Sequence, residues 1–197
     1  MIRAARQAVD LLLRAENTWR FEDPQHGLSD QEWMVLRFLA RANSFSRSPS
    51  ALAQFVGTTR SAVSQLLKGL EAKGYVERRP SVEDKRSVSL RVTPQGDKML
   101  TRDPIGPLVN AISALELGAN NFRDALRDVL GRLGTNQHRH HADNCGECIF
   151  LSSASDPAKG KAQMEFTCRF FRSGINSAEM DLLCFKFEQR RLDRAGG

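Results

Sequence analysis

The most informative stretch of the chain is residues 50–96, SALAQFVGTTRSAVSQLLKGLEAKGYVERRPSVEDKRSVSLRVTPQG. The Ser48–Pro49 pair just before it predicts a helix start. Serine accepts a hydrogen bond from the free amides of the first turn, and proline lacks the amide that would go unpaired there. A glycine ends this helix, and Thr58 or Thr59 caps the next one. The stretch therefore predicts two short helices, followed by a hairpin.

The second of these helices has two different faces. Apolar residues recur at helical spacing, so one face packs on a core; they are Val63, Leu66, Leu67 and Leu70. The opposite face carries polar side chains and cations that can contact base edges and phosphates; they are Thr59, Arg60, Ser61, Ser64, Gln65 and Lys68. Two helices joined by a tight turn, with a polar outer face on the second, form a helix-turn-helix pattern.

A hairpin follows these helices. Tyr75–Arg79 predicts one strand, and Ser87–Val92 predicts the other, with Val88, Leu90 and Val92 facing inward. From Arg60 to Arg91 there are eight Lys or Arg residues against four Asp or Glu residues, so this side is locally cationic. A cationic loop beside an exposed helix suits a phosphate or minor-groove contact. The candidate contact residues of the hairpin are Arg78, Arg79, Asp84, Lys85 and Arg86.

The order of these motifs resembles the winged helix of the MarR family of bacterial transcription regulators. The series is a leucine-rich helix ending in Glu71–Gly74, an arginine-rich strand, Asp84–Arg86, and Thr93–Gly96 starting another helix. The resemblance extends more loosely over residues 5–133. It implies a mainly α fold with a small β wing and a homodimer on a palindromic operator in double-stranded DNA. It also implies that the recognition helices enter successive major grooves and that Arg86, steadied by Asp84, reaches a minor groove. A winged helix used only for protein contacts is the alternative.

Composition favours a polyanionic partner. The 197 residues carry a formal net charge of +6, and nucleic acid is the natural candidate. The N-terminal segment has no uninterrupted apolar run long enough for a signal peptide, and no stretch approaches a membrane span. We therefore expect a cytoplasmic protein, in which thiols stay reduced.

Four regions are expected along the chain. Residues 2–20 predict an amphipathic helix, and Ser29 with Glu32 predicts a capping box at the start of a second helix. Prolines at 104 and 107 predict a break near residues 101–107. The expected regions are an N-terminal dimerisation helix (1–28), a winged helix-turn-helix (29–100), C-terminal dimerisation helices (101–136) and a cysteine-rich segment (137–197). Many MarR-like proteins bind a small effector beside the dimerisation region, but no residue here identifies one.

The last region contains all four cysteines of the chain: Cys145, Cys148, Cys168 and Cys184. A Cys-x-x-Cys pair places two thiolates on one metal or cluster, and the two single cysteines complete a set of four. Phenylalanines follow each cysteine site and could shield it from water; they are Phe150, Phe170, Phe171, Phe185 and Phe187. Three histidines in the linker at 137–141 are interpreted as a solvated basic segment.

Two metal interpretations fit this pattern. Four thiolates can hold a structural zinc, or an iron–sulfur cluster that adds redox chemistry. The single knuckle with two lone cysteines resembles the small cluster-binding subunits of glycyl-radical decarboxylases, which favours a cluster, with four irons as the preferred type. Oxidisable free thiols, or two disulfides, are the alternatives.

The sequence thus predicts a homodimeric MarR-like regulator, a repressor, whose iron–sulfur cluster senses redox, iron or oxygen state. Loss of the cluster would change the dimer geometry and the spacing of the recognition helices. One alternative is a MarR-type regulator with structural zinc and a small-molecule effector. A second is a redox or metal-handling enzyme that uses the winged helix for docking. The chain offers that enzyme no phosphate-cradling glycine loop and no nucleophile beside a base.

Overall fold

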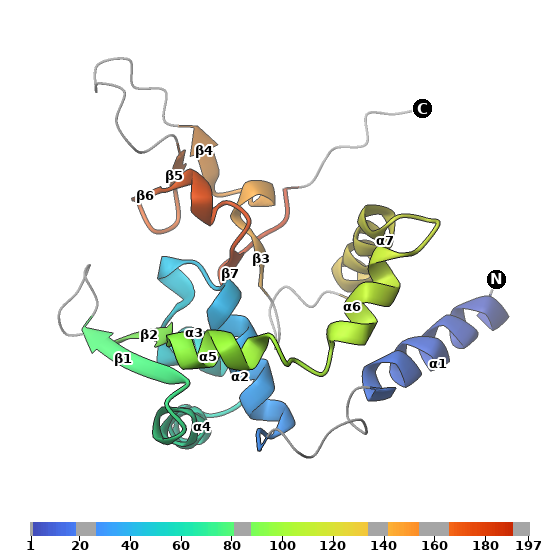
Figure 1. Cartoon of the computed structure of the whole chain (residues 1–197). Coiled ribbons are helices and arrows are strands. Elements are labelled where there is room, and N and C mark those ends of the chain that lie inside the picture. Colours follow the sequence, from blue (N-terminus) through green and yellow to red (C-terminus); the bar gives the residue numbers. More distant parts are fainter. Residues whose placement is uncertain (1, 19–26, 81–87, 134–141, 154–165, 191–197) are drawn as a thin grey trace.

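The computed structural model describes residues 2–18, 27–80, 88–133, 142–153 and 166–190 (Figure 1). The helices are α1 (Ile2–Thr18), α2 (Asp30–Arg41), α3 (Pro49–Val56), α4 (Arg60–Ala72), α5 (Pro94–Leu100), α6 (Gly106–Ser113) and α7 (Ala119–Arg132). The strands are β1 (Val76–Pro80), β2 (Val88–Val92), β3 (Asp143–Asn144), β4 (Leu151–Ser153), β5 (Phe166–Cys168), β6 (Ser173–Ile175) and β7 (Leu183–Cys184). Among the described helices, none is long and apolar enough to cross a membrane.

The predicted helix starts are confirmed. The Ser48 side chain accepts from the Ala51 amide at 3.2 Å, and Thr59, rather than Thr58, caps α4. Ser29 and Glu32 form the expected capping box at the start of α2. Between α3 and α4, Gly57 adopts a left-handed conformation (φ 70°), which a residue with a side chain rarely adopts. These helix caps and the left-handed glycine fix where α2, α3 and α4 begin and how the chain turns between α3 and α4.

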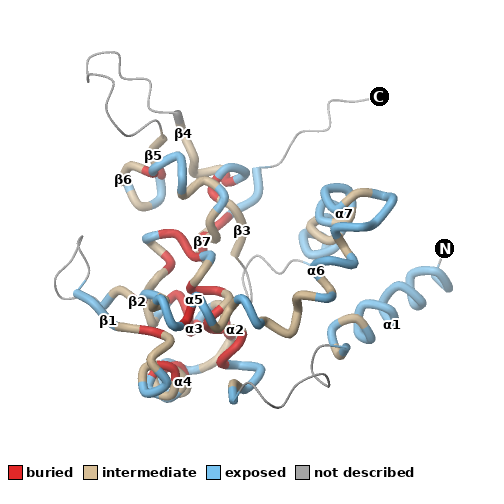
Figure 2. Tube along the Cα trace, viewed as in Figure 1, coloured by how far each residue is buried: buried red, intermediate tan, exposed pale blue. Residues whose placement is uncertain are grey.

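Helices α2, α3 and α4 enclose the main hydrophobic core (Figure 2). Side chains from α2 fill its centre, where Phe38 is 1% exposed and stacks on Phe55 with ring centroids 4.2 Å apart. From α4, the predicted residues Val63, Leu67 and Leu70 are fully buried, while Leu66 is only half-buried. Burial of these apolar groups is the main source of stability for the module.

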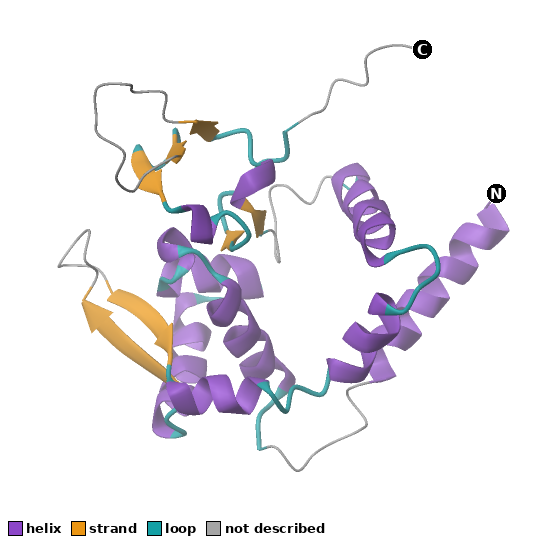
Figure 3. Ribbon diagram, turned by 45° about the horizontal axis from the view of Figure 1, so that its top comes forward, coloured by secondary structure: helices purple, strands orange, loops and turns teal. Residues whose placement is uncertain are grey.

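The hairpin β1–β2 forms the wing, which lies along one side of the helical cluster (Figure 3). Val76 pairs with Val92 near the core, and Leu90 is completely buried. The prediction that Val88 faces the core is wrong, because it pairs with Pro80 at the far end of the hairpin and is 38% exposed. The predicted contacts Asp84, Lys85 and Arg86 lie outside the described residues.

Gly96, in the first turn of α5, has no room for a side chain. A Cβ atom there would lie 2.7 Å from Val92 Cγ1 and would collide with the backbone oxygen of Tyr75. Because backbone cannot move aside cheaply, Gly96→Ala is expected to lower the free energy of unfolding by about 1–3 kcal/mol. Chemical denaturation measures the loss. Gly106→Ala is the matched control, since nothing lies within 4 Å of its Cβ position, and a loss as large as that of Gly96→Ala would contradict the steric argument.

The predicted break near residues 101–107 is confirmed, since α5 ends at Leu100 and α6 begins at Gly106. Asp103 stabilises this turn by accepting two hydrogen bonds from Arg37 of α2, at 2.5 and 2.7 Å. Helices α1, α6 and α7 bury no residue within the single chain. Their exposed large apolar residues are Ile2, Val9, Leu11, Leu12, Leu13, Val109, Val129 and Leu130.

A candidate metal centre and a candidate nucleic-acid interface

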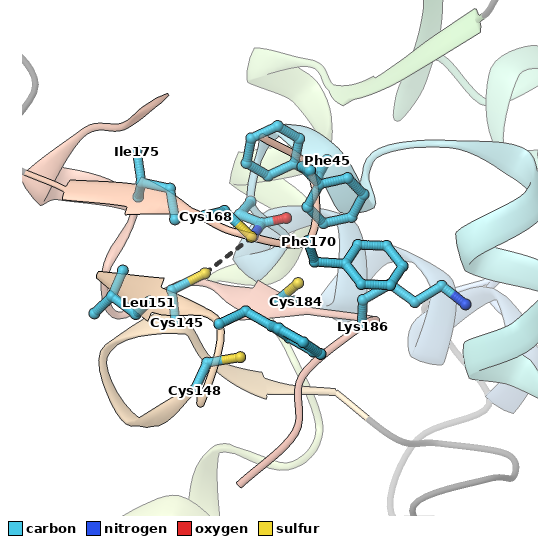
Figure 4. A pocket seen from close by; sticks show the side chains of 12 residues that line it. Phe45, Cys145, Cys148, Leu151, Cys168, Phe170, Ile175, Cys184 and Lys186 are labelled. Atoms are coloured by element: carbon cyan, nitrogen blue, oxygen red, sulfur yellow. Dashed lines mark hydrogen bonds between the residues drawn. The ribbon is translucent and has the colours of Figure 1, made fainter. Parts of the chain in front are cut away.

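The four cysteines lie together around one small cavity (Figure 4). Cys145 and Cys148 flank a tight turn in which the Cys148 amide donates to the Cys145 carbonyl at 3.0 Å. Cys168 comes from the end of β5, and Cys184 comes from β7. Each cysteine is at most 7% exposed, and all four are free thiols. Three segments that are distant in sequence thus deliver sulfur atoms to one place.

Two very small sheets position these segments. In the first, β3 pairs with β7 and sets Asp143 opposite Cys184. In the second, β5 lies between β4 and β6, with Leu151 opposite Cys168. The buried core of this segment consists of the four cysteines with Ile175 and Phe187. So small a core supplies little stability by itself, which is the usual setting for a metal or other cross-link.

Aromatic rings close the cavity. Phe150, Phe170 and Phe171 line it, as the sequence suggested, and Phe187 is buried nearby. Phe185 does not line the cavity but packs near Phe171, with ring centroids 6.2 Å apart.

A fourth ring, which the sequence did not predict, comes from the winged helix. Phe45 stacks on Phe171 at 4.3 Å, with the rings almost parallel. Phe45 belongs to residues 42–48, which join α2 to α3 and which we call the interhelix loop.

Polar groups of the same loop reach the sulfur atoms. The amide nitrogen Nδ2 of Asn43 donates to Cys145 Sγ at 3.2 Å. Ser46 contacts the segment through its hydroxyl, which accepts from the Phe185 amide at 3.1 Å. Both side chains are almost completely buried, which is uncommon for asparagine and serine. A single sequence gives no signal for this contact, because asparagine and serine in a polar connection usually face solvent.

Hydrogen bonding shifts the pKa values of Cys145 and Cys184 in opposite directions. A hydrogen bond from Cys145 lowers the pKa of Cys184 to about 6 despite its burial, with help from the Lys186 amide, Asn43 and Ser46. The same hydrogen bond, together with burial, raises the pKa of Cys145. Burial raises the pKa of Cys148. Cys184 therefore becomes a thiolate, the form that binds metals, more readily than Cys145 or Cys148.

The donor chemistry suits a soft metal or an iron–sulfur cluster. The cavity lining supplies four sulfurs and apolar or aromatic groups, with Lys186 as its one charged side chain. The room between them is about 10 Å³, close to the space of one water molecule. Within the described ranges, no three His, Cys, Asp or Glu side chains are already arranged to hold a metal ion. To bind a metal ion, the cysteine side chains would have to rotate or move apart. A four-iron cluster would require a larger movement than a zinc ion.

The predicted nucleic-acid face lies on α4 and β1. Arg60, Ser61, Gln65 and Lys68 are exposed on α4, while Ser64 is half-buried. The Thr59 hydroxyl accepts from the Ala62 amide at 3.2 Å, so it is already used in capping the helix.

Two exposed arginines of β1 have acidic neighbours. Arg78 pairs with Glu71 at 2.8 Å, and Arg79 pairs with Glu77 at 2.6 Å. A phosphate contact by either arginine would have to compete with these carboxylates.

A second, larger cavity of about 380 Å³ lies beside α2 and the α5–α6 turn. Its walls combine apolar side chains such as Met34 and Phe38 with charged side chains of both signs, which are Arg37, Arg41, Glu16, Asp30 and Asp103. Size and lining are suitable for a small organic molecule.

Helices α2 to α5 and the hairpin β1–β2 form a winged-helix fold, with an exposed polar face on α4. Residues 26–87 match the MarR family model. The chain is 31% identical over 107 residues to the HTH-type transcriptional repressor YetL of Bacillus subtilis (strain 168), covering 54% of this chain and 64% of YetL. It is 30% identical over 89 residues to the transcriptional repressor MprA of Escherichia coli (strain K12), covering 45% of this chain and 50% of MprA.

A solved structure agrees with this fold. The crystal structure of NadR in complex with 4-hydroxyphenylacetate has a TM-score of 0.51 and 24% identity, covering 64% of this chain and 89% of that chain. The chain spans less than two thirds of the length of YetL and MprA, and the family model ends well before the cysteine-rich segment. The proteins matched are transcription regulators and not enzymes.

Proposed function

We propose that the protein is a homodimeric MarR-type repressor whose four-cysteine site holds an iron–sulfur cluster and senses redox, iron or oxygen state. The observation that carries this proposal is the convergence of four buried thiols against the interhelix loop of a winged helix. A sensor needs contact between the part that changes and the part that reads DNA. The two matched relatives named above are repressors, which supports the direction of control.

Binding to double-stranded DNA is supported by the surface of α4. Its exposed side chains, including Gln65 and Lys68, can bond to base edges and phosphates. The net charge of +6 favours association with a polyanion. In a dimer with two-fold symmetry, two copies of α4 would read the two halves of a palindromic operator.

Homodimer formation is supported by the apolar faces of α1, α6 and α7. Leu11 and Leu13 of α1 are 57% and 53% exposed, and Leu130 of α7 is 53% exposed. Several exposed leucines on neighbouring helices are costly in water and are typical of an interface. A second copy of the chain would cover them.

In the cysteine-rich segment, the four thiolates would hold the cluster and the phenylalanine rings would keep water away from it. When bound, an iron–sulfur cluster supplies one-electron redox chemistry and sensitivity to oxygen. The Asn43 amide already donates to one ligand sulfur, and such bonds tune cluster potentials. In this proposal the cysteines bind the cluster, the phenylalanine rings shield it from water, and Asn43 polarises it through a hydrogen bond.

The competing proposal is a structural zinc combined with a small-molecule effector. The narrow room between the sulfurs favours a single ion over a four-iron cluster. An effector would then occupy the 380 Å³ cavity beside Arg37 and Arg41. In that case the cysteine site would hold the segment together without sensing.

Purification without oxygen decides between these proposals. Visible absorption, together with iron, sulfide and zinc analysis, identifies the bound group. Gel shifts with the region upstream of the protein's own operon, before and after removal of that group, test DNA binding and sensing. Iron with sulfide, and an affinity that changes on their removal, would support the cluster sensor. One zinc per chain without iron would support the competing proposal, and no preference for the upstream DNA would contradict both.

Lys68 offers a specific test of the DNA contact. Lys68→Ala is expected to weaken binding to all sequences and to lower the slope of log K against log salt by about one unit, because one fewer phosphate would be neutralised. Lys98→Ala removes the same charge from an exposed position on α5 and should leave the slope unchanged. Fluorescence anisotropy at several salt concentrations gives both slopes. Equal slopes in wild type and Lys68→Ala would remove Lys68 from the contact surface.

A further inference from the structure

The interhelix loop is attached to the cysteine-rich segment along its length. Asn43 donates its backbone amide to the Leu183 carbonyl at 2.9 Å, beside a bridge between Ala42 and Leu183. Ser44 donates its amide and its hydroxyl to the Glu179 carboxylate, at 2.8 and 3.2 Å. The loop therefore makes backbone and side-chain hydrogen bonds to the cysteine-rich segment.

Asn43 lies at the centre of this attachment. It is 1% exposed, and its Nδ2 donates to Cys145 Sγ. Its Oδ1 accepts from the Ser46 amide at 3.0 Å and from the Ser46 hydroxyl at 2.6 Å. The same hydroxyl accepts from the amide of Phe185, the residue after Cys184. A continuous buried hydrogen-bond network thus connects Cys145 through Asn43 and Ser46 to the neighbour of Cys184. Such networks are sensitive to any change in one member.

The far end of the loop reaches both DNA-reading elements. The Arg47 carbonyl, one residue after Ser46, accepts from the Leu90 amide of the wing strand β2 at 2.7 Å. Ser48, the next residue, caps α3, which packs against the recognition helix α4. A change in the position of Ser46 would therefore move Arg47, which contacts the wing, and Ser48, which begins the helix-turn-helix.

We propose that Asn43 is the positioning residue that transmits occupancy of the four-cysteine site to the DNA-reading module. This inference rests on the proposed function. A bound group would fix the position of the Cys145 sulfur, and with it the position of the buried Asn43 side chain that donates to this sulfur. The bound group thereby favours one arrangement of the interhelix loop, which is the differential interaction that coupling requires. The signal passes within one subunit, from Cys145 to the loop and then to β2 and α3.

A competing route exists through Arg127 of α7. It donates to Asp143 at 2.6 Å and to Glu147 at 2.8 Å, and both acids belong to the cysteine-rich segment. That contact would carry the same signal to the dimerisation helices and change the spacing of the recognition helices. The two routes use different residues, so separate substitutions can distinguish them.

The test compares Asn43→Asp and Ser46→Ala with Arg127→Ala. Asn43→Asp keeps the shape and the acceptor for Ser46 but removes the donor to Cys145. Ser46→Ala removes the hydroxyl that links Asn43 to Phe185 and that also bonds to Cys184, and it leaves the contact between Asn43 and Cys145 in place. For each protein, iron content is measured first. Affinity for the upstream DNA is then measured with the bound group present and after its removal. The coupling ratio is the larger of these two affinities divided by the smaller, so a ratio of one means that the bound group has no effect on DNA binding.

In wild type, the ratio is expected in the range of about 5 to 150 that is common for coupled sites. With iron content unchanged, at least one loop variant should lower it by about fivefold or more, towards one, while Arg127→Ala preserves it. Hydrogen exchange of the Leu90 amide gives an independent readout. It should depend on the bound group in wild type but not in that variant.

The opposite results overturn the inference. A wild-type ratio in both loop variants, or a ratio of one in Arg127→Ala alone, would assign the signal to the dimerisation helices. Loss of iron from both loop variants would make Asn43 and Ser46 part of the site and not of a path. A ratio of one in wild type itself would overturn the proposed sensor together with this inference.

Discussion

Cys148→Ser, purified without oxygen, is expected to contain less than about a tenth of the iron and sulfide of the wild-type protein. Cys148 is the second thiol of the Cys145–Cys148 turn and is 5% exposed, so solvent cannot easily supply a replacement ligand. A serine oxygen is a hard donor that holds iron in a sulfide cluster poorly. The visible absorption of the cluster should disappear with the metal. DNA affinity should equal that of wild type from which the group has been removed.

Met180→Leu is the matched control for this substitution. Met180 packs against the cysteine core, and its methyl group lies 3.7 Å from the Gly146 Cβ position, yet it is not a candidate ligand. The exchange keeps the volume nearly constant, so iron and sulfide should remain at the wild-type amount. Full iron and sulfide in Cys148→Ser would exclude Cys148 as a ligand. Zinc without iron in both wild type and Met180→Leu would identify the site as structural.

Phe38→Ala is expected to lower the free energy of unfolding of the winged helix by about 3–5 kcal/mol, because it removes a buried ring and leaves a cavity. The ring is 1% exposed and stacks on Phe55, so few neighbours can move in to fill the space. Such a loss is a large part of the stability of a typical domain. Urea denaturation followed by circular dichroism measures it.

Phe38→Leu tests whether the loss comes from the cavity. Leucine retains much of the volume and all of the apolar character, so this variant should lose clearly less stability than Phe38→Ala. Equal losses in the two variants would indicate that the stacked pair with Phe55, and not the filled volume, provides the stabilisation. Phe38 also lines the 380 Å³ cavity, so DNA binding is best compared under conditions in which both variants are folded.

The winged helix was predictable because its signals are local. Ser29, Ser48 and Thr93 cap their own helices within three residues, and apolar residues at helical spacing identify the faces of α2 and α4. The error at Val88 has the same origin. Alternation predicts which side of a strand a residue occupies, but it does not show where the core beneath the strand ends.

The cysteine site was predictable only in part. Four cysteines confined to one segment indicated that they would meet, but no local signal showed which surface the segment packs against. Asn43 lies 102 residues before Cys145, and Ser46 lies 139 residues before Phe185. Contacts of this separation depend on the complete fold. They are the contacts through which the site reaches the winged helix.

The same sequence separations imply an order of assembly. Short-range contacts form early, whereas contacts across a hundred residues carry a large loop-closure cost and form late. Helices α2 to α5 lie within residues 30–100 and leave the ribosome before the first cysteine. A nascent chain would thus complete its DNA-reading module while the interhelix loop still lacks its partners. Under the proposed function, a new molecule would bind DNA without responding to the signal until its cysteine-rich segment docks.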